Sequence, residues 1–290
     1  MTTQTTTVRR GRRGRRISPT RIFVYLVVGL YSLTTVLAFA WIFLTSLKTT
    51  PEFLSNSPWS LPEAPQFVNY VNSWKYANFG RYFANTLLAA TVGGGMSVAI
   101  STTAAYALSR IKFPFSRLVG AYFLIGYMVP LMLSVIPIYF MLPKIGLGTG
   151  LTPLILIYIA SGIPFNTFVL GSYLASLPYE MEEAAAIDGA SPFRTFWQIM
   201  VPLAMPGLVS VFFINFLSLW NEFFLALLFL RDENMTLAVG LFGLLRRAQY
   251  SGTWAEVFAG MIISVAPVLI IFAFLQQRIT KGLTFGAIKG

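Results

Sequence analysis

Cysteine and histidine are both absent from the 290-residue chain. Their absence excludes disulfides, thiol nucleophiles, histidine bases and the usual zinc sites. Charge is also scarce, because only 11% of the residues are charged, against roughly 25% in an ordinary soluble domain. A water-soluble fold with so little charge would lack polar surface, whereas 56% of this chain is hydrophobic. We therefore expect lipid to be its main solvent.

The motifs of a nucleotide-binding enzyme are missing as well. No G-x-x-x-x-G-K-[ST] segment occurs, so ATP binding through a P-loop is not expected. No base and nucleophile are accompanied by a plausible third group, which leaves no candidate catalytic residue. We predict that the chain is not an enzyme and carries no catalytic site, no metal and no cofactor of its own.

The net charge of +11 could indicate nucleic-acid binding, but its distribution favours another interpretation. Seven of the 21 basic residues lie within residues 1–21, directly before a long apolar run. A basic tail in this position is typical of a topology signal that also contacts anionic membrane lipid. We therefore divide the chain into a basic cytoplasmic tail, 1–21, and a membrane domain, 22–290, and expect no nucleic-acid partner.

Six apolar runs have the length of about 20 residues that a membrane-spanning helix needs. In hydrocarbon the backbone must satisfy its own hydrogen bonds, so each run is expected to be helical. The fold class is therefore an all-α integral membrane protein with six spans. The runs are Ile22–Leu47, Asn85–Leu108, Leu118–Met141, Leu151–Leu174, Leu208–Leu230 and Val257–Leu275.

The first run has an alternative interpretation as a cleaved signal peptide, because a basic region precedes it and Ala38-Phe39-Ala40 resembles a cleavage site. The apolar part of a signal peptide is about 7–15 residues long. This run continues to Leu47, so an uncleaved first span is expected.

Lysine and arginine asymmetry predicts an orientation with both termini in the cytoplasm. In that orientation 14 of the 21 basic residues are cytoplasmic and seven are outside. The prediction depends on the basic tail and on the short loop with Arg110, Lys112 and Arg117, since the two sides are equal without the tail.

Helix breakers occur inside several runs, among them Pro130 and Pro137 in the third and Gly93–Gly95 in the second. Close helix packing is the favoured interpretation, and a hinge lining a path is the alternative. Outside the membrane, the proline-rich segment 48–84 is either a plain linker or a loop with short interfacial helices.

The cytoplasmic loop 177–207 has the signals of two short helices that meet at a sharp turn. The acidic residues Glu180, Glu182 and Glu183 favour a helix start. Gly189 suits the left-handed residue that ends a helix. Ser191 suits the N-cap of the next helix, followed by a proline.

The second of these helices places four large apolar residues at the spacing i, i+3, i+4 and i+7, which predicts one shared face. They are Phe193, Phe196, Trp197 and Met200. The face could pack against the ends of the chain's own bundle or against a partner protein, and the periodicity does not separate the two.

The loop resembles the EAA motif of ABC importer permeases, which runs E-A-A, three residues, G, nine residues, I, one residue, L-P. Glu183-Ala184-Ala185, Gly189 and Ile199 occupy the matching positions, and Val201 replaces the usual Leu before Pro202. The segments Trp220–Phe224 (WNEFF) and Gly282–Gly290 (GLTFGAIKG) resemble the carbohydrate-uptake permeases, in particular the second permease subunit of maltose-type and glycerol-3-phosphate-type systems.

This resemblance implies a type I ABC importer permease fold in a bacterial or archaeal inner membrane. It also implies a heterodimer with a second permease subunit, a dimer of cytoplasmic ATPases that hold ATP and Mg²⁺, and an extracytoplasmic solute-binding protein. The loop would be the coupling helix that docks on the ATPase, and Lys289 in the C-terminal tail would lie near the same interface. The implied coupling residues are Glu182, Glu183, Ala184, Ala185, Asp188, Gly189, Ala190, Ser191 and Phe193.

Polar residues within the expected spans are costly in lipid and therefore candidates for a solute pathway. The alternative for Glu222 is a satisfied hydrogen bond between helices. The outer loop Arg231–Glu256 is implied by the resemblance to contact the binding protein. The candidate pathway residues are Asn166, Asn215, Asn221 and Glu222.

The resulting prediction is a permease subunit of an ATP-driven importer for a sugar or sugar-like solute. The alternative is a self-contained secondary transporter or channel, which would need coupling-ion carboxylates or a filter and has no use for a helix–glycine–helix loop in the cytosol. A membrane-embedded enzyme is a third class, for which catalytic groups are missing.

Overall fold

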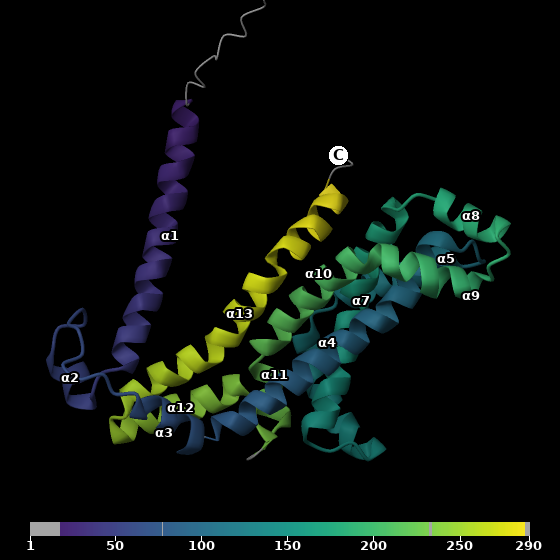
Figure 1. Cartoon of the computed structure of the whole chain (residues 1–290). Coiled ribbons are helices and arrows are strands. Elements are labelled where there is room, and N and C mark those ends of the chain that lie inside the picture. Colours follow the sequence, from purple (N-terminus) through teal and green to yellow (C-terminus); the bar gives the residue numbers. More distant parts are fainter. Residues whose placement is uncertain (1–17, 77, 232–233, 288–290) are drawn as a thin grey trace, which may run out of the picture.

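The computed structural model describes residues 18–76, 78–231 and 234–287, and every regular element in this part of the chain is a helix (Figure 1). The basic tail up to residue 17, and Lys289, lie outside the described residues. The helices are α1 (Pro19–Ser46), α2 (Thr50–Ser55), α3 (Val68–Tyr76), α4 (Phe79–Arg110), α5 (Ser116–Met128), α6 (Leu131–Met141), η1 (Leu142–Ile145), α7 (Leu151–Ser176), α8 (Glu180–Ile187), α9 (Pro192–Thr195), η2 (Phe196–Met200), α10 (Val201–Trp220), α11 (Phe224–Phe229), α12 (Leu237–Ser251) and α13 (Trp254–Ala287).

Five helices of the described chain are long and apolar enough to cross a membrane, and a bent pair, α5 with α6, makes a sixth if it is counted as one span. The start of α1, the end of α13 and the α8–α9 loop lie at one end of the molecule, while α2, α3 and α12 lie at the other (Figure 1). This arrangement agrees with the predicted topology, in which both termini and the loop face the cytoplasm.

The third expected span is not a straight helix, which corrects the prediction for Leu118–Met141. The helices α5 and α6 meet at an angle of 92°. Pro130 lacks a backbone N–H and disfavours helical geometry at Val129, whose ψ is 117°. The chain therefore breaks here, whereas Pro137 stays inside α6 and Pro164 inside α7.

The fifth expected span, Leu208–Leu230, also has the wrong bounds. The helix begins on the cytoplasmic side at Pro192, passes through the turn η2, and ends at Trp220. Its early start follows from Ser191, which accepts a hydrogen bond from Arg194 N, and from Pro192 in the first turn, where no intrahelical N–H bond is needed. Its early end follows from Glu222, whose carboxylate accepts hydrogen bonds from the N–H groups of Leu225 and Ala226 and so starts α11.

The core of the bundle is formed where α4 packs along α7 and α10. The glycines of α4 make this approach possible: a Cβ at Gly93 would lie 3.0 Å from Cβ of Tyr158 on α7. At Gly94 it would lie 3.5 Å from Cβ of Asn215 on α10. Close helix packing, the interpretation favoured from the sequence, is therefore confirmed for these glycines.

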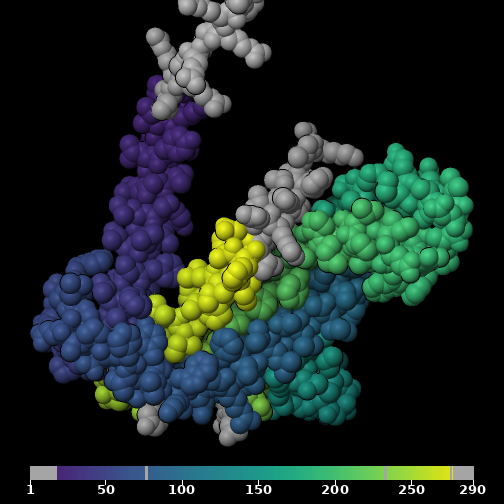
Figure 2. Space-filling model, viewed as in Figure 1, coloured from purple at the N-terminus to yellow at the C-terminus, as the bar shows by residue number. Residues whose placement is uncertain are grey.

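The first helix stands apart from this bundle. The most apolar stretch of α1 has no buried residue, and its side chains are exposed from Ile22 to Leu37. Figure 2 shows α1 joined to the rest of the described chain at its outer end only. The contact there includes Trp41, whose ring centroid lies 5.4 Å from that of Phe258 on α13.

The outer loop contains the short helices α2 and α3, as one of the two sequence interpretations expected. Buried polar groups hold it against the spans. Asn69 donates to the carbonyl oxygens of Ser46 and Lys48, at 2.8 and 3.0 Å. Ser73 donates to the carbonyl oxygen of Glu256 at 2.7 Å, which ties α3 to the start of α13.

Candidate functional site

The cytoplasmic loop folds as its sequence predicts, into two short helices around a glycine turn. Helix α8 ends in a Schellman motif, in which Ala190 N donates to Ala185 O at 2.9 Å and Gly189 N donates to Ala186 O at 3.1 Å. Gly189 has a φ of +78°, a conformation that an L side chain rarely adopts. Ser191 then caps α9 by accepting a hydrogen bond from Arg194 N at 3.3 Å.

Helix α8 presents one face to solvent and one to the protein. Ala185 is buried and Glu182 half-buried, whereas Glu183 and Ala184 are exposed. Ile187 is 86% exposed, which is unusual for a large apolar side chain. Among the other predicted coupling residues, Asp188, Gly189, Ser191 and Phe193 are exposed and Ala190 is half-buried.

The predicted apolar face of the second helix is divided, which corrects the prediction of one shared face. Phe196 and Met200 are buried, while Phe193 is 75% and Trp197 48% exposed. The four residues span an arc of about 100° on a helix, with Phe196 and Met200 on the side toward the bundle. The segment also contains η2, a π-helical turn in which Val201 N donates to Phe196 O. Packing on the bundle is therefore confirmed for two of the residues. The other two are uncovered in the described chain, and a partner protein for them stays a prediction.

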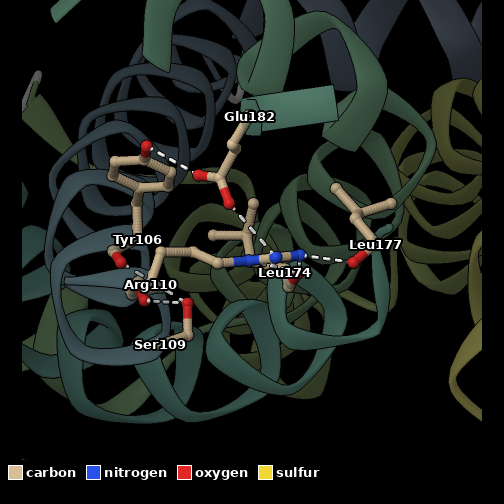
Figure 3. A network of polar contacts seen from close by, with 7 residues as sticks. Tyr106, Ser109, Arg110, Leu174, Leu177 and Glu182 are labelled. Atoms are coloured by element: carbon tan, nitrogen blue, oxygen red, sulfur yellow. Dashed lines mark hydrogen bonds and ion pairs between the residues drawn. The ribbon is translucent and has the colours of Figure 1, made fainter. Parts of the chain in front are cut away.

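The inward face of α8 is held by a polar network that connects three helices (Figure 3). Arg110, the last residue of α4, donates through Nη1 to Oε2 of Glu182 at 3.2 Å. The hydroxyl of Tyr106, one turn earlier on α4, donates to Oε1 of Glu182 at 2.8 Å. Both oxygens of this carboxylate are thus bound within the chain.

Arg110 also binds the C-terminal end of α7. Its Nε donates to Leu174 O at 3.1 Å and its Nη2 to Leu177 O at 2.6 Å, and Nη2 contacts Leu174 O as well. The guanidinium carbon lies 4.1 Å from the ring centroid of Tyr179, which precedes α8. Carbonyls at a helix C-terminus lack intrahelical donors and carry partial negative charge, so they suit a cation.

From the sequence, Arg110 is expected only as a topology charge, and no motif predicts this network. The one available signal was an arginine at the end of an apolar span in a chain with few carboxylates. That signal does not name Glu182, which is 72 residues away.

The candidate pathway residues fall into two groups in the described structure. Asn166, fully buried, exchanges hydrogen bonds with Asn215 and donates to Ser97 Oγ at 2.9 Å, so these residues join α7, α10 and α4. Glu222 accepts a 2.6 Å hydrogen bond from the Tyr158 hydroxyl in addition to its two backbone bonds. These contacts support inter-helix packing for Asn166, Asn215 and Glu222, whose pathway role stays a prediction.

Asn221 differs from the other three because its side chain is exposed. It lines a cavity of about 390 Å³ bounded by α1, α10, α12 and α13. The wall of the cavity combines aromatic rings, Phe39 and Trp220, with the polar Ser264. Among the described residues no cluster of three Asp or Glu side chains could hold a metal ion.

Comparison with known proteins identifies the family. The model for binding-protein-dependent transport system inner membrane components matches residues 95–285. The chain belongs to this family. It is therefore the membrane-spanning permease subunit of an ABC importer, and ATP hydrolysis takes place on a separate chain. This membership decides against a self-contained secondary transporter, channel or enzyme.

The permease is similar over most of its length to ABC transporter permeases of several bacteria. It is 36% identical to the diacetylchitobiose uptake system permease protein NgcG of Streptomyces coelicolor, covering 90% of this chain and 86% of that protein. It is 34% identical to the trehalose transport system permease protein SugB of Mycobacterium tuberculosis, covering 91% and 95%. It is 33% identical to the inner membrane ABC transporter permease protein YcjP of Escherichia coli, covering 93% and 97%.

Solved structures support the fold of the permease. A chain of a bacterial ABC transporter involved in the import of the acidic polysaccharide alginate has a TM-score of 0.76 at 23% identity, covering 90% of this chain and 98% of that one. A chain of the MetNI methionine ABC transporter in an inward-facing conformation has a TM-score of 0.54 at 20% identity, covering 70% and 95%. The type I importer permease fold is thereby confirmed.

Proposed function

We propose that the permease imports a sugar or a sugar-like solute into the cytoplasm of a bacterium or an archaeon across the inner membrane. The similar relatives support this substrate class, because two of them are described as permeases for diacetylchitobiose uptake and for trehalose transport. Discrimination among sugars is expected to depend mainly on an extracytoplasmic solute-binding protein, with the outer segment Arg231–Glu256 as its docking region. The permease itself makes no covalent change to the solute.

The observation that carries the coupling proposal is the exposed face of the α8–α9 loop. Ile187 and Phe193 are large apolar side chains that are 86% and 75% exposed in the described chain. Glu183 is also exposed and lies one turn before Ile187 on α8. An apolar patch with a charged neighbour on a cytoplasmic loop fits a docking site for a protein. We assign it to the ATPase dimer, which would hold ATP and Mg²⁺, while the permease holds no cofactor.

A second permease subunit would cover the exposed surface of α1. This helix is apolar on all faces and almost unburied from Ile22 to Leu37, and a single helix leaning away from its bundle has no packing of its own. A heterodimeric partner accounts for the exposed surface of α1 better than lipid alone, because two permease chains are needed to enclose a path between them. The remaining surface would face membrane lipid.

Within the membrane, Asn221 is the candidate pathway residue that the geometry supports best. A sugar has apolar faces formed by its C–H groups and a rim of hydroxyls. An exposed amide can bind a sugar hydroxyl through a hydrogen bond, and the aromatic rings beside it can stack on an apolar face of the sugar. The cavity at Asn221 has this composition. Asn221 Nδ2 donates to Leu217 O one turn earlier at 2.8 Å, but the residue is exposed, whereas Asn166, Asn215 and Glu222 are bound between helices.

The docking proposal is tested by co-purification of the complex from detergent. Ile187→Ser and Phe193→Ser should each reduce the ATPase retained by the permease, because they remove apolar area from the patch. Leu61→Ser is the matched control, since Leu61 is 71% exposed on the outer side of the membrane. Full retention by both patch variants would contradict the assignment, as would a wild-type permease that never retains an ATPase.

The pathway proposal is tested by uptake competition with a panel of sugars in vesicles. Asn221→Ala should change the relative uptake of sugars that differ in one hydroxyl, because a hydrogen-bonding site discriminates against a ligand that leaves it unpaired. Asn56→Ala, in the exposed outer loop, should leave the ratios unchanged. An unaltered ratio in the Asn221 variant would remove this residue from the pathway.

A further inference from the structure

We propose that Arg110 is a positioning residue that fixes the coupling helix α8 to α4 and α7, so that movement of the ATPase is transmitted to the bundle as a rigid-body motion. The inference rests on the proposed coupling function, and it adds a role for residues that do not touch the ATPase. It also separates the two adjacent carboxylates of α8: Glu182 serves the attachment inside the chain, and Glu183 serves the docking surface outside it.

The first support is the position of Arg110 at a junction of three helices. It belongs to α4, its guanidinium binds the carbonyls of Leu174 and Leu177 at the end of α7, and it pairs with Glu182 in the first turn of α8. The chain itself connects α7 to α8 through only three residues, 177–179. Without the arginine, α8 would be joined to α4 chiefly by the hydrogen bond between Tyr106 and Glu182.

The second support is burial. The side chain of Arg110 is 1% exposed, and that of Glu182 is 18% exposed. A buried ion pair by itself is weak evidence for stability, because two charges lose their hydration. It is strong evidence for defined geometry when every guanidinium nitrogen has an acceptor, and here the three nitrogens reach a carboxylate and two carbonyls while the group stacks on the ring of Tyr179.

The third support is the chemistry of the guanidinium. Its planar fork of N–H groups can bind a carboxylate on one side and carbonyls on another at the same time. A lysine has one nitrogen on a flexible stem and cannot hold all three segments in fixed register. Arg110→Lys therefore keeps the positive charge but loses the simultaneous bonds to the carboxylate and the carbonyls. This substitution separates a role of the fixed geometry from a role of the charge alone.

The mechanical consequence follows from the packing of α4 and α7. These helices pack along each other for much of their length, and α4 runs for 32 residues from the cytoplasmic end to the outer end. A displacement of α8 that is rigidly attached to both would move the core of the bundle. If the attachment is loose, α8 can move with the ATPase while the bundle stays behind, and ATP is hydrolysed without import.

The test uses the whole transporter, with both permeases, the ATPase and the binding protein, reconstituted in proteoliposomes. The measurements are the solute imported per ATP hydrolysed and, separately, the ATPase retained on purification. We expect Arg110→Lys and Glu182→Gln to retain the ATPase but to import roughly fivefold less solute per ATP. Glu183→Gln is the matched control, and it should weaken ATPase retention instead.

A second variant keeps the test decisive if Arg110→Lys does not fold. Tyr106→Phe keeps the ring, which packs on Phe196 at 4.9 Å, and removes only the hydrogen bond to Glu182. It should also lower the solute imported per ATP, by a smaller factor than Arg110→Lys. The double variant Tyr106→Phe/Glu182→Ala should lose no more than Glu182→Ala alone, because the alanine already removes the oxygen that accepts the Tyr106 hydrogen bond.

A distance measurement reports the rigidity itself. The chain has no cysteine, so spin labels can be placed at Glu180→Cys on α8 and Lys112→Cys after α4 without other substitutions. In the assembled transporter the distance distribution should be narrow, and it should broaden when Tyr106→Phe or Arg110→Lys is added. Unchanged import per ATP together with an unchanged distribution in these variants would overturn the inference. A wild-type complex that binds no ATPase or imports no sugar would instead overturn the proposed function.

Discussion

Tyr158 on α7 donates a 2.6 Å hydrogen bond to Oε2 of Glu222, which lies two residues after the end of the fifth span at Trp220. The same carboxylate accepts the backbone N–H groups of Leu225 and Ala226, at 2.7 and 3.0 Å. A carboxylate inside a membrane protein is costly unless its oxygens are satisfied, and here three donors converge on it. The relationship explains both the break in the helix and the position of α11 against α7.

Glu222→Gln is expected to act on stability rather than on substrate choice. A glutamine keeps one oxygen but replaces the other with an NH₂ group, so at least one of the three donors loses its acceptor. The free energy of unfolding should fall by about 2 kcal/mol, as for hydrogen bonds to charged groups. Thermal unfolding in detergent checks this, and Glu63→Gln in the exposed outer loop should show no loss. A shifted preference among sugars with full stability would contradict the expectation and return Glu222 to the pathway.

Gly162 on α7 is expected to tolerate no larger side chain. A Cβ there would lie 3.1 Å from Asn215 Oδ1 and 3.3 Å from Asn166 Nδ2, and nearer still to Ser97 Oγ, in the buried junction of three helices. Gly162→Ala should therefore lower the free energy of unfolding by about 1–3 kcal/mol through overpacking. Gly171→Ala on the same helix meets nothing within 4 Å and should be neutral or slightly stabilising.

Thermal unfolding of Gly162→Ala and Gly171→Ala measures the difference in stability. Adding Ser97→Ala to Gly162→Ala should recover part of the lost stability, because it removes the oxygen nearest to the new Cβ. Equal stability of the two single variants would mean that the junction is looser than its contacts indicate.

Gly189→Ala is expected to impair coupling through the backbone alone. The residue has a φ of +78° and open space around its Cβ position, so the substitution adds strain of roughly 1–2 kcal/mol without a steric clash. Gly146 is the matched control, because it has the same φ and the same open space but lies after η1, outside the loop. Import per ATP should fall in Gly189→Ala and not in Gly146→Ala. Equal effects on coupling would show that only general stability had changed.

Glu52 is expected to make the outer loop sensitive to acid. The backbone N–H of Thr49, followed by that of Glu63 and the Thr49 hydroxyl, holds the pKa of this carboxyl below its ordinary value. The pKa is lowered in the folded state, so the stabilising contribution is complete above the pKa of a free glutamate, about 4.3. It is lost as the pH falls through the lowered value.

Hydrogen exchange of segment 49–63, corrected for the intrinsic rate, measures this effect. Protection should decrease on acidification in the wild type, and Glu52→Gln should be less protected at neutral pH with little further change. Glu63→Gln should keep the wild-type profile, because Glu63 contributes its backbone N–H rather than its side chain. A wild-type profile in Glu52→Gln would exclude the carboxylate as the cause.

Signals confined to a few neighbouring residues were sufficient for much of the molecule. The scarcity of charge and the length of the apolar runs determined the membrane class and most of the spans. Gly189, Ser191 and Pro192 determined the turn of the cytoplasmic loop, because left-handed φ and N-capping are properties of single residues and their immediate neighbours. The spacing of the EAA motif, which extends to Pro202, indicated the correct family.

Only the tertiary structure decided which distant residue each charged or polar side chain binds. Glu182 and Glu183 are adjacent in sequence, but the first meets Arg110 and the second faces solvent, since rotation of about 100° per residue separates them on α8. The pairs Arg110–Glu182 and Tyr158–Glu222 join residues more than 60 positions apart, so they depend on how helices pack and where they end. Hydropathy and local helix signals carry no information about that register. The loop that the sequence predicts to be a docking site is thus attached to the bundle by a residue that the sequence indicated only as a topology charge.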